Sequence, residues 1–269
     1  MHYRRLGRTE WMVSEVALSA RPLASADPAA VEETLTAALA AGINLLTVDA
    51  RPDTPELEEL IGRVALRARP HVLLASRMPA GLTAGELAAT VEATVERLDA
   101  KYLDLVLLAA ATDLAQLDVL DECREQGLVR AIGLSTLSAS STVTASAPEQ
   151  VAAAIAGGRV DVIEVALNLG ARGAAAAIEQ AAAAGLGVIA AAPLDGGALL
   201  RAERFAEPLR AATDGPPRTP AQAAIAWALS QRGVTAVAVG AATAERAAEN
   251  ADASRVAPLA PEVLASLDG

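Results

Sequence analysis

The chain has 269 residues with 33 acidic and 22 basic side chains, and its net charge of −11 argues against nucleic acid or an anionic membrane as a partner. Hydrophobic residues make up 53% of the chain and charged residues 20%, a balance that supports a large core and excludes disorder. No apolar run reaches the roughly 18 residues that a membrane span needs. With a single cysteine, Cys123, and no apolar signal segment at the N-terminus, we expect a cytoplasmic protein without an internal disulfide.

Short apolar runs alternate with helical patterns along the chain. In chain order, a strand at 13–20 precedes a helix at 28–42, a strand at 43–49 precedes a helix at 55–66, and a strand at 72–78 precedes a helix at 83–98. The pattern continues with strand 102–110 and helix 114–126, strand 129–136 and helix 148–156, and strand 162–168 and helix 174–184. Strand 187–193, helix 220–231, strand 237–241 and helix 243–251 complete it. Asp27 before Pro28, and Thr83 three residues before Glu86, are signals for helix starts.

Eight strand–helix units in a chain of this length predict an α/β fold, a closed (β/α)8 TIM barrel that forms one domain over residues 1–269. No G-x-G-x-x-G follows the first strand, so an open dinucleotide-binding sheet is not indicated. The chemistry of such barrels lies at the carboxyl ends of the strands. The residues to inspect there include Arg21, Thr47, Asp49, Arg77, Ala109, Ser135, Glu164, Ala191 and Thr243.

Several blocks, in order along the chain, resemble the aldo-keto reductase family. They lie at 3–9 with 13–14, 42–44 with 58–62, 102–105, 129–135, 193–197, 222–229 and 249–250. The resemblance implies a barrel whose bottom is covered by an N-terminal β-hairpin. It also implies carbonyl reduction with NADPH, in which a Tyr acid is activated by a Lys–Asp pair beside a His.

The resemblance departs from the family at the residues that carry this chemistry. The family's Asp, Tyr, Lys and His correspond to Thr47, Pro52, Arg77 and Ala109. An arginine does not release its proton in a protein, so Arg77 cannot replace a lysine in a proton relay.

The nicotinamide side is changed as well. Ser135 is kept, but the next residue is Thr136 instead of Asn, the family's Gln corresponds to Glu164, and its stacking aromatic corresponds to Ala191. The residues that match the segment around the adenosine phosphate and adenine are Thr243, Arg246, Glu249 and Asn250. We therefore expect either no cofactor or NADP(H) that keeps contacts only at its adenosine end.

Three functional hypotheses follow. The first is a non-redox biosynthetic enzyme for a bulky apolar small molecule, acting by dehydration, cyclisation or isomerisation, with Glu164 as general base and Arg77 as oxyanion or carboxylate partner. Its pocket would include Arg21, Thr47, Asp49, Ala109 and Ala191. The alternatives are a catalytically inactive NADP-binding or regulatory homologue, in which Arg77 and Glu164 form a structural ion pair, and an NADPH-dependent oxidoreductase with a substituted proton donor. The sequence indicates no metal site, because one of its two histidines, His71, precedes the third strand on the bottom side of the barrel and the other, His2, lies in the terminal hairpin.

Overall fold

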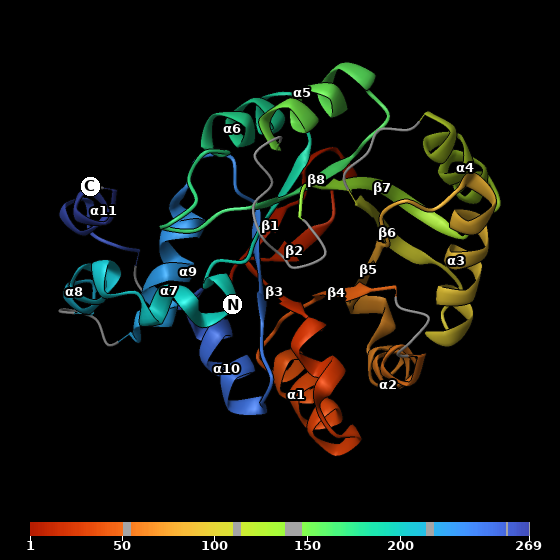
Figure 1. Ribbon diagram of the computed structural model, residues 1–269. Helices are drawn as coiled ribbons and strands as arrows, with labels where there is room; N and C mark the ends of the chain where they lie inside the picture. The colour runs from red at the N-terminus through yellow and green to blue at the C-terminus, as the bar shows by residue number, and fades with distance from the viewer. Residues whose placement is uncertain (51–54, 110–113, 138–146, 214–217, 257, 269) are drawn as a thin grey trace.

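The computed structural model describes residues 1–50, 55–109, 114–137, 147–213, 218–256 and 258–268. Eight parallel strands close into a barrel in the order β10-β3-β4-β5-β6-β7-β8-β9 (Figure 1). The barrel strands are β3 (Val16–Ser19), β4 (Leu45–Asp49), β5 (Leu73–Met78), β6 (Leu103–Ala109), β7 (Val129–Ser135), β8 (Val162–Ala166), β9 (Gly187–Ala191) and β10 (Ala236–Gly240). The predicted (β/α)8 barrel is confirmed.

The helices lie outside the strands (Figure 1). They are α1 (Pro28–Ala40), α2 (Pro55–Leu66), α3 (Ala84–Arg97), α4 (Leu114–Glu125), α5 (Ala147–Gly157), α6 (Ala175–Ala183), α7 (Ala198–Arg201), α8 (Glu203–Ala211), α9 (Pro220–Ser230), α10 (Ala244–Asp252) and α11 (Pro261–Asp268). Helices α8 and α11 lie farther out than the others, beyond α9 (Figure 1). In the part of the chain that the structure describes, no helix is long and apolar enough to cross a membrane.

Side-chain caps explain where several helices begin. The Asp27 carboxylate accepts hydrogen bonds from the backbone N–H groups of Ala29 and Ala30 at the start of α1. Thr83 and Glu86 form the predicted capping box at the start of α3. These local signals place the helix starts that follow the strands.

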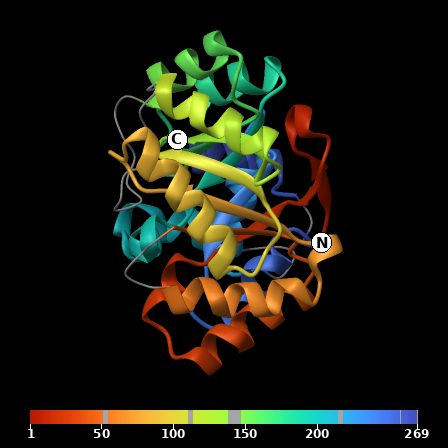
Figure 2. The ribbon, with the colours of Figure 1, turned by 90° about the vertical axis from the view of Figure 1, so that its right-hand side faces the viewer.

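A two-stranded hairpin precedes the barrel. Strands β1 (Tyr3–Arg5) and β2 (Met12–Ser14) pair antiparallel, and Figure 2 shows this N-terminal segment at the right-hand end of the molecule. Between them Leu6 is fully buried and lies so close to Gly187, the first residue of β9, that a Cβ there would sit 2.7 Å from the Leu6 side chain. The hairpin therefore plugs the amino-terminal end of the barrel, as the resemblance implies.

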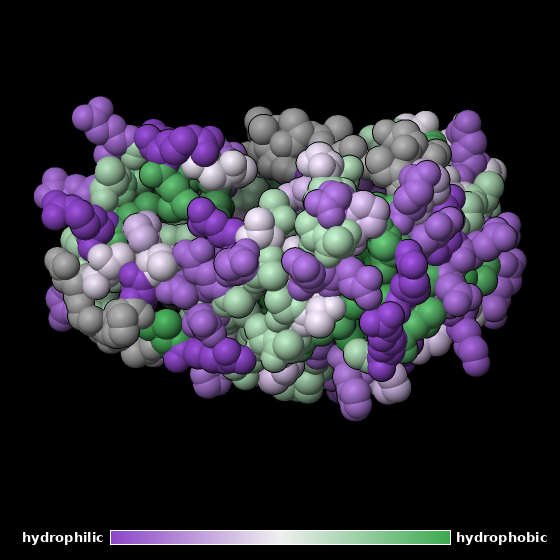
Figure 3. All heavy atoms as spheres, turned by 90° about the horizontal axis from the view of Figure 1, so that it is seen from below, coloured by the Kyte–Doolittle hydropathy of each residue, from purple (hydrophilic) through white to green (hydrophobic). Residues whose placement is uncertain are grey.

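The core has two layers. One cluster fills the barrel interior and includes Leu6, Val13, Leu105 and Ile189, and a larger one lies between the strands and the helices. The surface seen from below carries mostly polar side chains, with apolar areas between them (Figure 3).

The element boundaries differ from the prediction in three places. The predicted strand at 13–20 is divided between two strands, because Val13 and Ser14 pair with β1 in the hairpin and the barrel strand begins only at Val16. Helices α7 and α8 lie between β9 and α9, and α11 follows α10, where no helix is predicted. These three helices are short, and Pro208 lies inside α8, so their sequence signal is weak.

Candidate functional site

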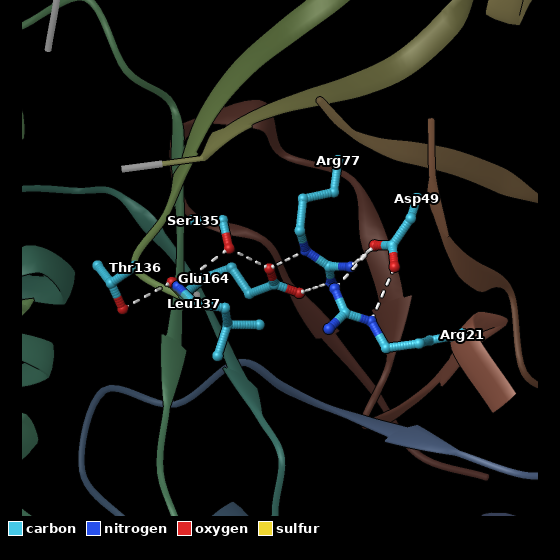
Figure 4. Close-up of polar contacts among 7 residues, drawn as sticks. All are labelled: Arg21, Asp49, Arg77, Ser135, Thr136, Leu137 and Glu164. Atoms are coloured by element: carbon cyan, nitrogen blue, oxygen red, sulfur yellow. Dashed lines mark hydrogen bonds and ion pairs between the residues drawn. The ribbon is translucent and has the colours of Figure 1, made fainter. Parts of the chain in front are cut away.

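Four charged side chains form a continuous series of ion pairs at the carboxyl ends of the strands (Figure 4). Arg21 follows β3, Asp49 ends β4, Arg77 lies near the end of β5, and Glu164 is in the middle of β8. The Arg21 Nε lies 2.7 Å from Asp49 Oδ2, and the Arg77 Nη1 donates to the other oxygen of Asp49. Arg77 thus stands between two carboxylates.

Both carboxylate oxygens of Glu164 accept hydrogen bonds from protein donors. Arg77 donates to it through two nitrogens, Nη2 to Oε1 at 2.5 Å and Nε to Oε2 at 2.7 Å. The Ser135 hydroxyl donates to Oε2 at 2.6 Å. The residue is 0% exposed. Glu164, expected to face the cavity as a general base, instead holds an internal ion pair.

The opposite charges in this series favour the ionised forms of Arg77 and Asp49. Burial alone would lower the pKa of Arg77, but Glu164 and then Asp49 raise it, and the net shift is upward. Burial alone would raise the pKa of Asp49, but Arg77 and Arg21 lower it, and the net shift is downward. Asp49 is therefore ionised at neutral pH, and Arg77 is a still poorer proton donor than a free arginine.

A cavity of about 540 Å³ opens beside this series, at the ends of β3, β9 and β10. That volume is typical of small-molecule sites. Its walls are rich in alanine, and its charged lining residues in the described part of the chain are all arginines: Arg21, Arg77, Arg201 and Arg246. Such a lining favours an anionic ligand.

The structure brings only some of the predicted site residues to this cavity. Arg21, Arg77, Ala191, Arg246 and Asn250 line it. Thr47, Asp49, Ser135 and Glu164 are not in its described lining, and all of them except Asp49 are buried. The side chain of Ala109, and Pro52 as a whole, lie outside the described residues.

The predicted adenosine-end residues lie on or before α10. Thr243 caps the helix by accepting from the Arg246 N–H at 3.3 Å. The Arg246 Nη1 lies 3.4 Å from Glu249, with the two side chains 62% and 24% exposed, and the Asn250 side chain donates to the Gly240 carbonyl at 3.3 Å. Thr243 and Glu249 thus support the helix that carries the two lining residues.

The loop after β9 supplies further lining residues that sequence reasoning missed as individual contacts. Leu194, Gly196, Gly197, Leu200 and Arg201 all line the cavity. Gly196 and Gly197 adopt φ of 61° and 86°, which glycine accepts at little cost. The block at 193–197 was a signal for this loop, but nothing in the sequence singled out Arg201.

Comparisons with known proteins agree with this architecture. The model of the Aldo/keto reductase family matches residues 17–269. The holo form of aldo-keto reductase AKR11C1 from Bacillus halodurans is similar with a TM-score of 0.84 and 20% identity, over 99% of this chain and 95% of that one. A thermostable aldo-keto reductase, Tm1743, solved with the inhibitor epalrestat, gives a TM-score of 0.86 and 24% identity over 100% and 99% of the two chains. No curated protein matches the chain at a significant level.

Proposed function

The chain belongs to the aldo-keto reductase family, and on that premise we propose that it binds NADP(H), or a related adenosine phosphate, by the phosphate-bearing end without reducing carbonyls. The single observation that carries the proposal is the division of the site into two parts. One part is the cavity wall that carries Arg201 and Arg246, and the other is the series of ion pairs among Arg21, Asp49, Arg77 and Glu164, whose two arginines also reach the cavity.

The residues present fit the phosphate end of such a ligand. Arg201 and Arg246 lie in the cavity wall, and Arg201 has no ion-pair partner within the described residues. Arginine recognises phosphate through paired hydrogen bonds. Asn250 stands beside them, so the cavity offers both cationic and amide groups to an adenosine phosphate.

The residues on the nicotinamide side do not fit that half of the ligand. The Ser135 hydroxyl and both oxygens of Glu164 are engaged with each other or with Arg77. The Thr136 hydroxyl donates to the backbone carbonyl of Glu164 at 3.3 Å. Ala191 offers no ring face, and aromatic stacking is worth roughly 0.5–1.5 kcal/mol beyond burial.

Proton transfer also lacks a carrier at the cavity. The described lining contains no Asp, Glu, His, Cys or Tyr, and Arg77 does not titrate near neutral pH. In the resemblance to the family, Thr47 and Arg77 stand where the reductase has its Asp and Lys. This supports binding without turnover over an oxidoreductase with a substituted proton donor.

A non-redox enzyme is the second candidate, and one observation favours it. Arg77 reaches a cavity walled by Ala191, Ala192, Ala238 and Ala241, which suits an apolar molecule with one oxyanion. Glu164 is not available as its base because it is buried and its oxygens are engaged. This candidate therefore ranks below the binding function.

The test is a calorimetric titration of the intact chain with NADPH. Arg246→Ala and Arg201→Ala should each weaken binding by roughly 10- to 100-fold, the effect of losing a charged hydrogen bond. The matched control is Arg255→Ala, since Arg255 is on the surface, pairs with Asp252 and is not a cavity residue. Equal affinities for all four proteins, or no binding by the unmodified chain, would refute the proposal.

A steady-state assay tests the second half of the proposal. With NADPH and reactive aldehydes or quinones, turnover should stay far below about 1 s⁻¹, the low end for ordinary enzymes. Turnover at or above that value would contradict the proposed loss of carbonyl reduction.

A further inference from the structure

A second cavity, of about 650 Å³, lies at the opposite end of the barrel, where the hairpin meets the amino ends of the strands. It is bounded by the hairpin, the start of β4, the turn at Arg69–His71 before β5, and the segment leading into β6. None of its described lining residues takes part in the arginine-lined cavity. It is therefore a separate cavity.

The aromatic residues of the chain gather at this cavity. The sequence has only five Phe, Trp and Tyr residues, and three of them, Tyr3, Trp11 and Tyr102, line it. Tyr3 and Met12, which also line it, are 45% and 54% exposed, and they are the exposed large hydrophobic side chains of the described chain. Exposed apolar groups that meet at one hollow mark a binding surface better than scattered ones.

Two guanidinium groups stack on these rings. The Arg69 guanidinium lies 4.5 Å from the centre of the Tyr102 ring, and that of Arg130 lies 5.3 Å from Tyr102 and 5.2 Å from Trp11. Both arginines also pair with Asp104, at 2.7 and 3.2 Å. The ring and guanidinium planes are thus held in place before any ligand arrives, which lowers the cost of binding.

The polar groups left over at the cavity are mainly donors. Arg130 uses only Nη1 on Asp104, and its side chain is 47% exposed. The Trp11 indole N–H and the His71 ring have no hydrogen-bond partner within the described residues. Asp104 is 1% exposed and already accepts from Arg69, Arg130 and the Leu74 N–H, so it presents no free acceptor to a ligand.

From these groups we infer that the cavity is a binding site for a small planar aromatic carboxylate. The ring of the ligand packs against Trp11, Tyr102 and Met12, and its carboxylate accepts from Arg130. The described lining carries two arginines and one aspartate, whereas the chain as a whole has a net charge of −11. The preference for an anion is therefore a property of this cavity and not of the whole surface. The site is independent of the proposed nucleotide cavity.

A set of three matched probes tests the inference: 2-naphthoate, the neutral 2-naphthol and the cationic 2-naphthylmethylamine. The chain has two tryptophans, so a 15N spectrum shows two indole N–H signals, which Trp11→Phe assigns. We expect 2-naphthoate to move the Trp11 signal with a Kd of about 1 mM or tighter, and to leave the signal of the buried Trp227 unchanged. It should bind at least about tenfold more tightly than the other two probes.

Variants separate the site from general attraction of anions. Arg130→Gln should weaken 2-naphthoate binding by about tenfold or more. Met12→Ser, which changes an exposed side chain and so spares the fold, should weaken it by about two- to threefold. Arg5→Gln, an exposed arginine on the same hairpin but outside this cavity, should leave it unchanged, as should Arg246→Ala at the other end of the barrel.

Equal binding of the three probes, a shift of the Trp227 signal alone, or an undiminished affinity in folded Met12→Ser and Arg130→Gln proteins would overturn the inference. Failure of NADPH to bind would leave it untouched, because the two cavities share no described lining residue.

Discussion

Replacing Glu164 by Gln tests the role of the buried ion pair. The substitution keeps the shape of the side chain but removes its charge, and it puts an NH2 group where one oxygen now accepts from Arg77 or Ser135. At least one donor would then face another donor in a site that is 0% exposed. If Glu164 is a structural partner of Arg77, the cost appears as lost stability.

The expected size follows from what Arg77 keeps. Removing one partner of a buried pair typically costs about 3–5 kcal/mol. Arg77 retains its contact with Asp49, so we expect a loss of about 2–4 kcal/mol in the free energy of unfolding. A second substitution, Arg77→Met, should restore part of this loss because it removes the unpaired charge.

Urea unfolding followed by circular dichroism measures the change. The control is Asp252→Asn, which breaks an exposed pair with Arg255 whose side chains are both 48% exposed, and it should cost about 0–1 kcal/mol. A Glu164→Gln protein within about 0.5 kcal/mol of the unmodified chain would refute the structural role, because it would lie inside the range of surface pairs.

Three further substitutions test other parts of the structure. The pKa of Asp49 is lowered in the folded protein, so the contribution of its charge to stability is complete above the unfolded pKa of about 3.9 and is lost as pH falls through the folded pKa. The stability lost in Asp49→Asn, measured by urea unfolding, should therefore be full at pH 7 and should shrink below about pH 4. A loss that does not depend on pH would contradict this. Gly62→Ala in α2 would place a Cβ 2.2 Å from the Leu98 carbonyl oxygen, and it should lower the free energy of unfolding, measured by thermal unfolding, by about 1–3 kcal/mol or more. As a control, the Cβ of Gly85→Ala in α3 would meet nothing within 4 Å, and this substitution should be neutral or stabilising. Pro52→Tyr should not yield carbonyl reduction in the steady-state assay, since a tyrosine alone lacks the paired Lys and Asp that activate it, and measurable turnover would show that the rest of the site supports the reaction.

The sequence was sufficient to predict the barrel because strand and helix signals alternate in every unit. Buried parallel strands read as continuous apolar runs, and caps such as Asp27 mark the helix starts. The boundary at Val13 was wrong for the same reason, since an apolar run does not show where the chain leaves the hairpin for the barrel. Short helices such as α7 and α11 gave too little periodicity to predict.

The site was harder to predict because its contacts form across the barrel. The meeting of Arg77 and Glu164 could be expected as an ion pair, but they lie on β5 and β8, which are separated by two strands. That the Ser135 hydroxyl completes the shell around Glu164, and that Asp49 shares Arg77, depends on the register of neighbouring strands. Sequence patterns do not show that register, so the structure was needed to show that Glu164 is buried and does not line the cavity.

We propose that the protein binds the phosphate end of NADP(H) and does not hold the nicotinamide half. Calorimetric titration with 2′,5′-ADP, NADP+ and nicotinamide mononucleotide under one set of conditions tests it most directly. We expect 2′,5′-ADP and NADP+ to bind within about threefold of each other, a difference below 1 kcal/mol, and nicotinamide mononucleotide to show no binding. NADP+ binding more than about tenfold tighter than 2′,5′-ADP would show that the nicotinamide half has its own contacts and would contradict the proposed binding by the phosphate end alone.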